Sequence, residues 1–466
     1  MAAAVELGSV STGLRVMFAM LTPNESSFEK VEDVPKYVHE ATPFFVGLIM
    51  LELVVGVLKT GASVVTISDG LTSISAGMTS RLPLLFMRGC ELSAYMYVWD
   101  RYRLLELPWD SAWTWWFTFL GVDFCFYWVH RSAHEVAILW AAHQVHHSSE
   151  YYNLTTALRQ SLTQQFTSWI FYLPLALVVP PSIFAVHIQL NLLYQFWIHT
   201  ELIRDLGPLE WVFNTPKHHR VHHGRNLYCI DKNYGGILII WDRLFGTFAL
   251  ETDKVVYGLV FPIKTFEILH VQLHYYSYLW RKSNAYKKLV NKLSTFMNGP
   301  SWKPGKPRLG DHVNNPKVTG EEVPHDPSWS LPLQVYVVIH FLLVLLTYHD
   351  LFENKMADGG CPGDATLRRH GDAAEVQLRE APAAFARCAH RGLCLPLSAV
   401  LGSAERLSAA QHQEEGRLSR RHDRRLNFFF LSHNHRHDSF PTLFNKLEHT
   451  SSVSPSISMM LEMFLS

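Results

Sequence analysis

Cysteine and net charge are both scarce in this sequence, and each scarcity excludes a class of protein. The six cysteines, at positions 90, 125, 229, 361, 388 and 394 of 466, form no CxxC pair. A disulfide framework and a thiolate-bound iron–sulfur cluster are therefore not expected. Basic and acidic residues number 41 each, so no basic surplus suggests nucleic-acid binding. The first 22 residues lack the basic start of a cleaved signal peptide.

Charged side chains are almost absent from four long apolar stretches. Residues 44–58 carry only Glu52 and residues 111–129 only Asp123, whereas residues 165–199 and 331–348 carry none. A membrane-spanning helix needs about 20 mostly apolar residues. The pattern therefore predicts an all-α integral membrane protein. Because Pro180 and Pro181 interrupt residues 165–199, we expect a helical hairpin there, inside the bilayer.

Composition divides the chain into six expected parts. They are an interfacial N-terminal segment (1–40), membrane helices (41–120), a histidine-rich catalytic domain (121–250), an interfacial helix with a Pro/Gly loop (251–330), a C-terminal membrane helix (331–349) and an atypical tail (350–466). Three hydrophobic helices are expected between residues 42 and 130, the middle one (77–98) interrupted by charges. The tail has no long apolar face and is predicted to be disordered, and its HNHRHD motif (433–438) is not expected to bind metal.

Histidines are concentrated in three short motifs: HRSAH (130–134), HQVHH (143–147) and HHRVHH (218–223). Residues three and four apart share a face of a helix, so each HxxHH motif is expected to bring its three histidines together. Structural zinc needs four ligands, and catalytic zinc three plus water. Eight imidazoles therefore predict a site for two metal ions in a helical domain at the membrane face. The eight are His130, His134, His143, His146, His147, His219, His222 and His223.

The identity of the metal is not fixed by imidazole ligands alone, because zinc, copper, iron and nickel all accept them. HEVAI (134–138) begins like a zinc-protease motif but has Ile138 where that motif needs a second histidine. An all-nitrogen pair of metal ions at a membrane face fits oxygen activation on a lipid. Iron is therefore the expected metal.

Three further histidines lie near these motifs. His199 ends the apolar stretch and is either a ninth ligand or an interfacial histidine. His187, inside the same stretch, is expected to be a hydrogen-bonded buried group. His218 falls outside the HxxHH spacing and is expected to support a ligand rather than be one.

Two acidic residues are expected to assist the metal ligands. Asp123 lies on the helical face of His130, and ligating histidines commonly donate their second N–H to a carboxylate. An acid at membrane depth is also costly and usually functional. Glu135 directly follows His134 and is expected to orient a ligand, relay protons or be solvated.

The motifs and their order among apolar helices resemble the fatty acid hydroxylase superfamily, which includes sterol desaturases, sterol methyl oxidases and fatty acid 2-hydroxylases. Within this superfamily, the sequence more specifically resembles the monooxygenases that cleave ether lipids. This resemblance extends from about residue 8 to 355. The motifs that carry it are LTSISAGM (71–78), LPWDS (107–111), HHSSEYYNLTTALRQS (146–161), NLLYQFWIHTE (191–201) and NTPKHHRVHHGRNLYCIDKNYGG (214–236). WDRLFGTF (241–248) belongs to the wider superfamily.

This resemblance implies a multi-pass enzyme of the endoplasmic reticulum membrane with a di-iron centre. It implies that the enzyme depends on tetrahydrobiopterin and uses O₂ to hydroxylate the ether-linked carbon of alkylglycerols. The resulting hemiacetal collapses to a fatty aldehyde and a glycerol derivative. Such chemistry needs a metal that changes oxidation state, which side chains alone cannot supply. No motif marks the pterin site or the oligomeric state.

The tail departs from the family pattern, because the resemblance implies further hydrophobic helices after residue 348. All eight motif histidines precede this break, so the metal site can assemble without the tail.

Three alternatives stay open: a sterol or fatty-acyl hydroxylase or desaturase of the same superfamily, a membrane protein that holds structural zinc, and a catalytically dead isoform. Redox-active iron coupled to O₂ consumption would distinguish the enzyme from a zinc protein.

Overall fold

The computed structural model describes residues 10–85, 90–312 and 315–357. Within these ranges the chain is helical, and three isolated β-bridges are the only strand-like pairings. The prediction of an all-α protein is therefore confirmed for this part of the chain. The predicted start of the disordered tail at residue 350 is wrong, because α16 continues to Ala357. The rest of the tail and its HNHRHD motif lie outside the described residues.

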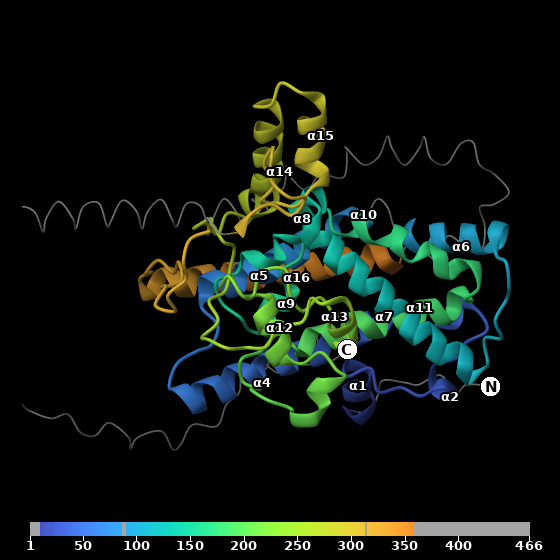
Figure 1. The fold of residues 1–466 in the computed structure, drawn as a ribbon. Helices are drawn as coiled ribbons and strands as arrows, with labels where there is room; N and C mark the ends of the chain where they lie inside the picture. Colours follow the sequence, from blue (N-terminus) through green and yellow to red (C-terminus); the bar gives the residue numbers. More distant parts are fainter. Residues whose placement is uncertain (1–9, 86–89, 313–314, 358–466) are drawn as a thin grey trace, which may run out of the picture. The chain divides into compact units, whose positions relative to one another are not determined.

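Most helices follow one another closely, but long connections precede α14 (residues 246–267) and α16 (residues 298–330) (Figure 1). The α-helices are α1 (Val10–Met17), α2 (Pro23–Ser26), α3 (Tyr37–Glu40), α4 (Thr42–Thr60), α5 (Ile67–Arg81), α6 (Cys90–Tyr102), α7 (Ala112–Glu135), α8 (Ala137–His143), α9 (Leu154–Leu158), α10 (Gln165–Ser168), α11 (Pro181–Trp197), α12 (Pro216–His222), α13 (Ile240–Phe245), α14 (Ile268–Asn284), α15 (Leu289–Met297) and α16 (Leu331–Ala357). The 3-10 helices are η1 (Val31–Asp33), η2 (Leu82–Leu85), η3 (His146–Ser148), η4 (Trp169–Phe171), η5 (Leu173–Leu177) and η6 (Gly207–Trp211).

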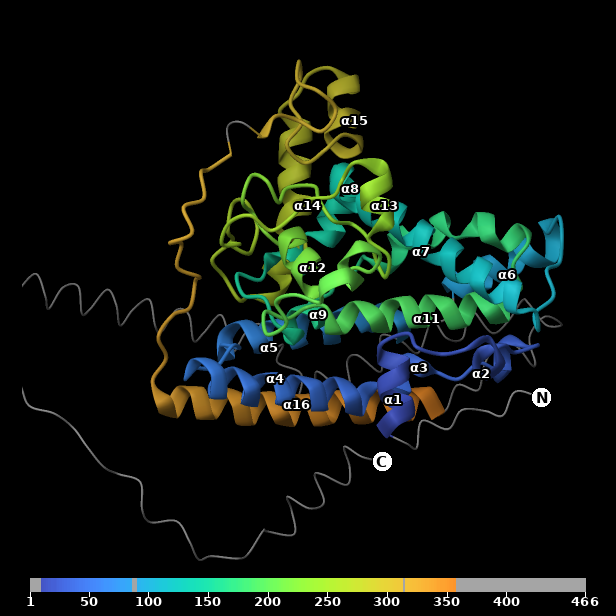
Figure 2. The ribbon, with the colours of Figure 1, turned by 60° about the horizontal axis from the view of Figure 1, so that its bottom comes forward.

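Two stretches of the described chain are long and apolar enough to cross a membrane. They are Val31–Lys59, which contains α4, and Leu331–His349, which lies within α16. In Figure 2 the two helices run along the same direction at one edge of the ribbon, and most of their side chains are not buried in the protein. Gly61, at φ +74°, ends α4 in the left-handed conformation that glycine adopts readily.

The centre of the fold is α11, which begins with Pro181 in the first helical turn, where the missing N–H costs nothing. This helix packs against α7, α1, α3, α6 and α9. Its residues Val186, Leu190 and Leu193 are buried in one apolar cluster with Val16 of α1 and Tyr37 of α3. The N-terminal segment thus contributes to the core.

The expected hairpin inside the bilayer differs from the structure. Residues 165–177 form only the short helix α10 and the 3-10 helices η4 and η5, and the long arm α11 is mostly buried inside the protein. The expected helix at 77–98 is divided between the end of α5, η2 and α6. The expected helix at 111–129 is present as α7, with Trp113 exposed on one side and Trp115 buried on the other.

Helices α14 and α15 form a hairpin that projects from the other helices and runs across the direction of α16 in both views (Figures 1 and 2). Glu267 caps α14 by accepting hydrogen bonds from the backbone N–H groups of Leu269 and His270. The base of the hairpin packs on α8 through the apolar cluster of Ala137, Ala141 and Leu279. This contact places α14 next to one of the histidine motifs.

Candidate metal centre

Nine buried histidines form two adjacent clusters, in each of which the ligand atoms lie within 4.8 Å of one another. The first cluster contains His130, His134, His143, His147 and His222. The second contains His146, His199, His219 and His223. The structure therefore brings together all eight motif histidines and His199, while His187 and His218 lie outside both clusters.

Each HxxHH motif divides its histidines between the two clusters. His143 and His147 belong to the first cluster and the intervening His146 to the second, whereas His222 belongs to the first and its neighbour His223 to the second. The prediction that each motif converges on one point is wrong. Successive residues of a helix point about 100° apart, so adjacent histidines face different centres.

Local helix ends place the histidines. Helix α7 carries His130 and His134 and ends at Glu135, because Val136 is extended. Helix α8 ends at His143, and the next histidines lie on the 3-10 helix η3 instead of continuing an α-helix. Helix α12, which carries His219 and His222, begins with Pro216 in its first turn.

Backbone carbonyls fix the orientation of four imidazole rings by accepting a hydrogen bond from Nδ1. The acceptors are Tyr234 O for His130 (2.9 Å), Arg159 O for His146 (3.1 Å), Gln195 O for His199 (2.7 Å) and Lys232 O for His222 (2.8 Å). A carbonyl only accepts, so Nδ1 carries the proton in each ring. In a neutral ring Nε2 is then an unprotonated lone pair, the form in which imidazole binds a metal.

Two of these lone pairs face each other. The Nε2 atoms of His146 and His199 are 3.1 Å apart, and both rings donate from Nδ1 to a carbonyl. Burial lowers the pKa of His146 to about 4, so its ring is neutral near pH 7. No proton is available for a hydrogen bond between the two nitrogens, and their lone pairs repel. A bound cation would turn this repulsion into coordination.

The spacing of the nitrogens agrees with ligation of single ions. In the first cluster His143 Nε2 lies 3.1 Å from His130 Nε2 and 3.2 Å from His147 Nε2. In the second cluster His219 Nε2 lies 3.0 Å from His199 Nε2 and 3.2 Å from His223 Nε2. Adjacent ligands of one ion at about 2.1 Å lie roughly 3.0 to 3.4 Å apart.

Nitrogen atoms without a hydrogen-bond partner in the first cluster also indicate a metal site. The Nε2 atoms of His134 and His222 are buried and have no hydrogen-bond partner among the described residues. A buried polar atom without a partner is costly, and a bound ion would supply the missing partner. The donor set therefore fits a metal ion in each cluster.

Asp123 does not contact a metal-site histidine through its hydrogen bonds, contrary to the expectation. Its oxygens accept from Asn191 Nδ2 (2.8 Å), Ile237 N (2.7 Å), Leu238 N (3.1 Å) and Trp241 Nε1 (2.9 Å). The reason is that the loop after residue 232 passes next to α7 and supplies these donors. Asp123 therefore holds the loop whose carbonyls face the histidines.

Glu135 is engaged in ion pairs. Its carboxylate lies 2.8 Å from Arg131 Nε and 2.5 Å from Arg308. Arg308 belongs to the Pro/Gly loop and also donates to the backbone carbonyl of Glu135. The acid thus joins that loop to the end of α7, next to His134.

Sequence reasoning missed several polar residues around the clusters. Asp231 lies 3.8 Å from His134 Nδ1 and 3.5 Å from His312 Nε2. Asp69 and Arg159 form a buried ion pair beneath His146, whose Nδ1 donates to Arg159 O. Asp242 accepts hydrogen bonds from the loop that faces His130. Asp231 and Asp242 lie within quoted motifs and Asp69 two residues before LTSISAGM, but only the tertiary contacts show what each acid touches.

Comparisons with known proteins agree with this centre. A sequence model of the fatty acid hydroxylase family matches residues 115–247, the range that contains all nine clustered histidines. No solved structure matches the chain.

Relatives match over most of their length. The chain is 65% identical to an alkylglycerol monooxygenase of Danio rerio over 348 residues, which are 75% of this chain and 78% of the relative. It is 58% identical to the Homo sapiens protein of that name over 349 residues, again 75% and 78%, and 38% identical to the Caenorhabditis elegans one over 360 residues, 72% and 71%. With this identity over more than two thirds of those relatives, the chain belongs to the alkylglycerol monooxygenase family, a group of oxidoreductases within the fatty acid hydroxylases.

Proposed function

We propose that this protein is a di-iron, tetrahydrobiopterin-dependent monooxygenase of the endoplasmic reticulum membrane that hydroxylates the ether-linked carbon of alkylglycerols. The facing lone pairs of His146 and His199 carry the metal part of the proposal. The family carries the substrate. The five histidines of the first cluster would hold one ion and the four of the second cluster the other.

Iron bound at the two clusters would supply the electron transfer that O₂ activation requires, which side chains cannot provide. Five nitrogen donors are one more than a tetrahedral structural zinc site uses, which favours iron over structural zinc. Tetrahydrobiopterin, when bound, would supply the two electrons with which one oxygen atom of O₂ enters the substrate and the other leaves as water. The hydroxylated ether carbon is a hemiacetal, which breaks its C–O bond to release a fatty aldehyde and a glycerol derivative.

The chain's own residues hold the centre ready for this chemistry. The backbone carbonyls that accept from Nδ1 of His130 and His222 turn their Nε2 atoms inward, and burial of the nine rings keeps water from them. Asp123 acts by fixing the loop at Ile237, and Glu135 acts by joining α7 to Arg308. Both acids are therefore positioning residues in this proposal.

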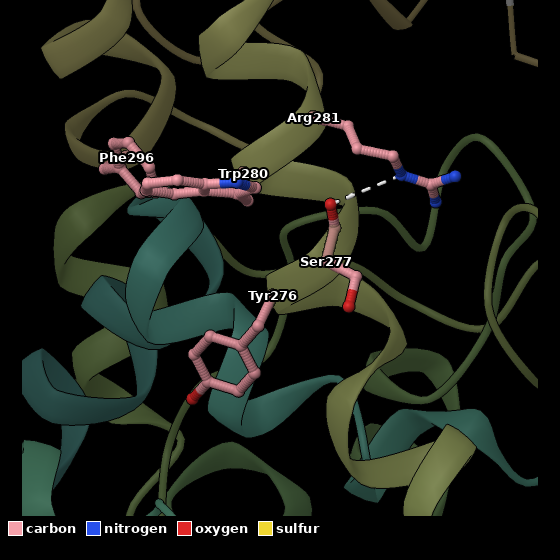
Figure 3. A pocket seen from close by; sticks show the side chains of 5 residues that line it. All are labelled: Tyr276, Ser277, Trp280, Arg281 and Phe296. Atoms are coloured by element: carbon pink, nitrogen blue, oxygen red, sulfur yellow. Dashed lines mark hydrogen bonds between the residues drawn. The ribbon is translucent and has the colours of Figure 1, made fainter.

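Helices α4 and α16 cross the membrane in this proposal, and the hairpin α14–α15 lies on its surface. Residues 268–310 contain eight Lys and Arg residues and no Asp or Glu, in a chain whose net charge is zero. Trp280, Leu289 and Leu293 are exposed on the hairpin, and Trp280 lines a shallow groove with Phe296 (Figure 3). Basic side chains next to exposed aromatic and aliphatic ones favour an anionic lipid surface.

Hydrogen exchange tests the placement of the hairpin. Residues 268–297 should exchange more slowly when the full chain is in nanodiscs with phosphatidylserine than in nanodiscs of phosphatidylcholine alone. Equal exchange in the two lipids would contradict it.

Aldehyde release from an alkylglycerol tests the function directly. Membranes containing the full chain should release fatty aldehyde only with tetrahydrobiopterin and O₂, and the purified protein should contain about two iron ions per chain. His146→Ala should abolish the activity and lower the iron content. Zinc in place of iron, or release of aldehyde by His146→Ala at the wild-type rate, would overturn the proposal.

A further inference from the structure

The peptide group between Tyr234 and Gly235 links a buried carboxylate to a clustered histidine. Gly235 N–H donates to Asp242 Oδ2 at 2.7 Å, and the Tyr234 carbonyl of the same peptide group accepts from His130 Nδ1 at 2.9 Å. The connection therefore runs from carboxylate to amide to imidazole without a gap. His130 Nε2 then faces the first cluster.

A peptide group transmits polarisation because its nitrogen and oxygen share one delocalised π system. An anion at the N–H end increases the negative charge on the carbonyl oxygen, which strengthens the hydrogen bond that this oxygen accepts. A stronger acceptor at Nδ1 makes the imidazole a better electron donor at Nε2. Carboxylates bonded directly to ligating histidines act in this way.

We propose that Asp242 tunes the metal of the first cluster through this carboxylate–peptide–histidine relay, as a positioning and charge-donating residue. The inference rests on the proposed two-metal function. In this relay the negative charge of Asp242 acts on His130 of the first cluster, although the Asp242 carboxylate does not contact the His130 ring.

The carboxylate of Asp242 accepts three hydrogen bonds, which stabilise its ionised form. Oδ1 accepts from Tyr234 N at 2.8 Å and from Thr247 Oγ1 at 2.7 Å, in addition to the Gly235 bond at Oδ2. Arg131 donates to Tyr127 Oη, which lies 3.0 Å from Thr247 Oγ1. A chain of hydrogen bonds thus links the Arg131 guanidinium to the Asp242 carboxylate. Burial raises the pKa of Asp242, and these donors oppose the rise because they favour the ionised carboxylate.

The close fit around Gly235 supports a dedicated contact. A Cβ at this position would lie 2.5 Å from Leu238 O and 3.1 Å from Asp242 Oδ2. Any larger residue would therefore push the peptide group away from the carboxylate. The glycine permits the close approach on which the relay depends.

Other histidines are held by carbonyls whose peptide N–H groups find different partners. His222 donates to Lys232 O, and the N–H of that peptide group, on Asn233, donates to the backbone carbonyl of Thr247. His199 donates to a carbonyl within α11. A neutral partner transmits less negative charge, so we expect His130 to differ from these two rings in donor strength.

Asp123 provides a matched control, because it is as fully buried as Asp242 and binds the same loop. It contacts the N–H groups of Ile237 and Leu238, and the carbonyls of these two peptide groups accept from Asn214 and not from a clustered histidine. Asp242→Asn and Asp123→Asn both remove a buried charge from the loop. Only Asp242→Asn removes the charge from the relay.

The experiment measures iron content, ferrous-iron affinity and midpoint potential in the purified full chain, for wild type and both variants. Asp242→Asn should weaken binding at one of two iron sites on the order of tenfold or more and shift its potential to more positive values, since electron donation falls. Asp123→Asn, which loosens the same loop but takes no charge from the relay, should lower thermal stability and shift the potential clearly less than Asp242→Asn. Thr247→Val, which keeps the side-chain shape but removes one donor from the carboxylate, should shift the potential in the negative direction.

Each outcome decides the proposal. If Asp242→Asn folds and keeps the wild-type potential and affinity, or if both Asn variants shift them equally, the relay is refuted while the two-metal function stands. If Asp242→Asn does not fold, Thr247→Val decides, and a potential unchanged from wild type refutes the relay. If wild type binds no iron, the proposed function fails and the relay fails with it.

Discussion

Replacing Asp123 by alanine should destabilise the fold strongly, because four donors converge on this one carboxylate. The donors are Asn191 Nδ2, Ile237 N, Leu238 N and Trp241 Nε1, at 2.7 to 3.1 Å. Each buried donor that is left without an acceptor costs about 1–3 kcal/mol, so four at the lower limit cost about 4 kcal/mol. Water that enters the new space would recover part of this cost.

Thermal unfolding of the detergent-solubilised full chain measures this effect. One kcal/mol corresponds to about 2–4 °C in domains of 150–250 residues, so a loss of about 4 kcal/mol should lower the apparent Tm by roughly 8 °C or more. Asp110→Ala is the matched control, since Asp110 is exposed and should change stability by less than about 0.5 kcal/mol. Equal apparent Tm values for the two variants would refute the view that Asp123 fastens the loop.

Three further predictions test the site and its surroundings. Because His222 and His223 face different clusters, His222→Ala should lower iron binding at the first and His223→Ala at the second; identical iron spectra for the two variants would contradict the division. Gly77→Ala should destabilise the chain by about 1–3 kcal/mol, because a Cβ there would lie 2.5 Å from a backbone oxygen of α9, whereas Gly47→Ala, inside α4, meets nothing within 4 Å and should not lower the apparent Tm. Deletion of the chain after Lys355 should leave aldehyde release close to that of the full chain, and a large loss would show that the tail is needed.

Sequence reasoning identified the metal-site residues better than it placed them. Spacing and residue type were enough to select His130, His143 and His219, because few other roles require repeated histidine pairs. The same spacing could not show that His146 turns away from His143, since this depends on α8 ending there. Long-range partners were equally invisible, because Asp123 meets a loop more than a hundred residues later. Apolar composition predicted two long helices at 165–199, whereas the structure has one, α11, packed among other helices, since hydropathy does not show where a helix breaks or what surrounds it.

The division of each HxxHH motif between two clusters has a consequence for biosynthesis. The first cluster includes His222 and the second includes His219 and His223, so neither donor set is complete until the ribosome has passed residue 223. Before α12 is made, the chain already holds four of the five histidines of the first cluster but only His146 and His199 of the second. We therefore expect the first cluster to be able to bind its ion before α12 is made, whereas the second cluster has to wait until α12 has been translated and folded.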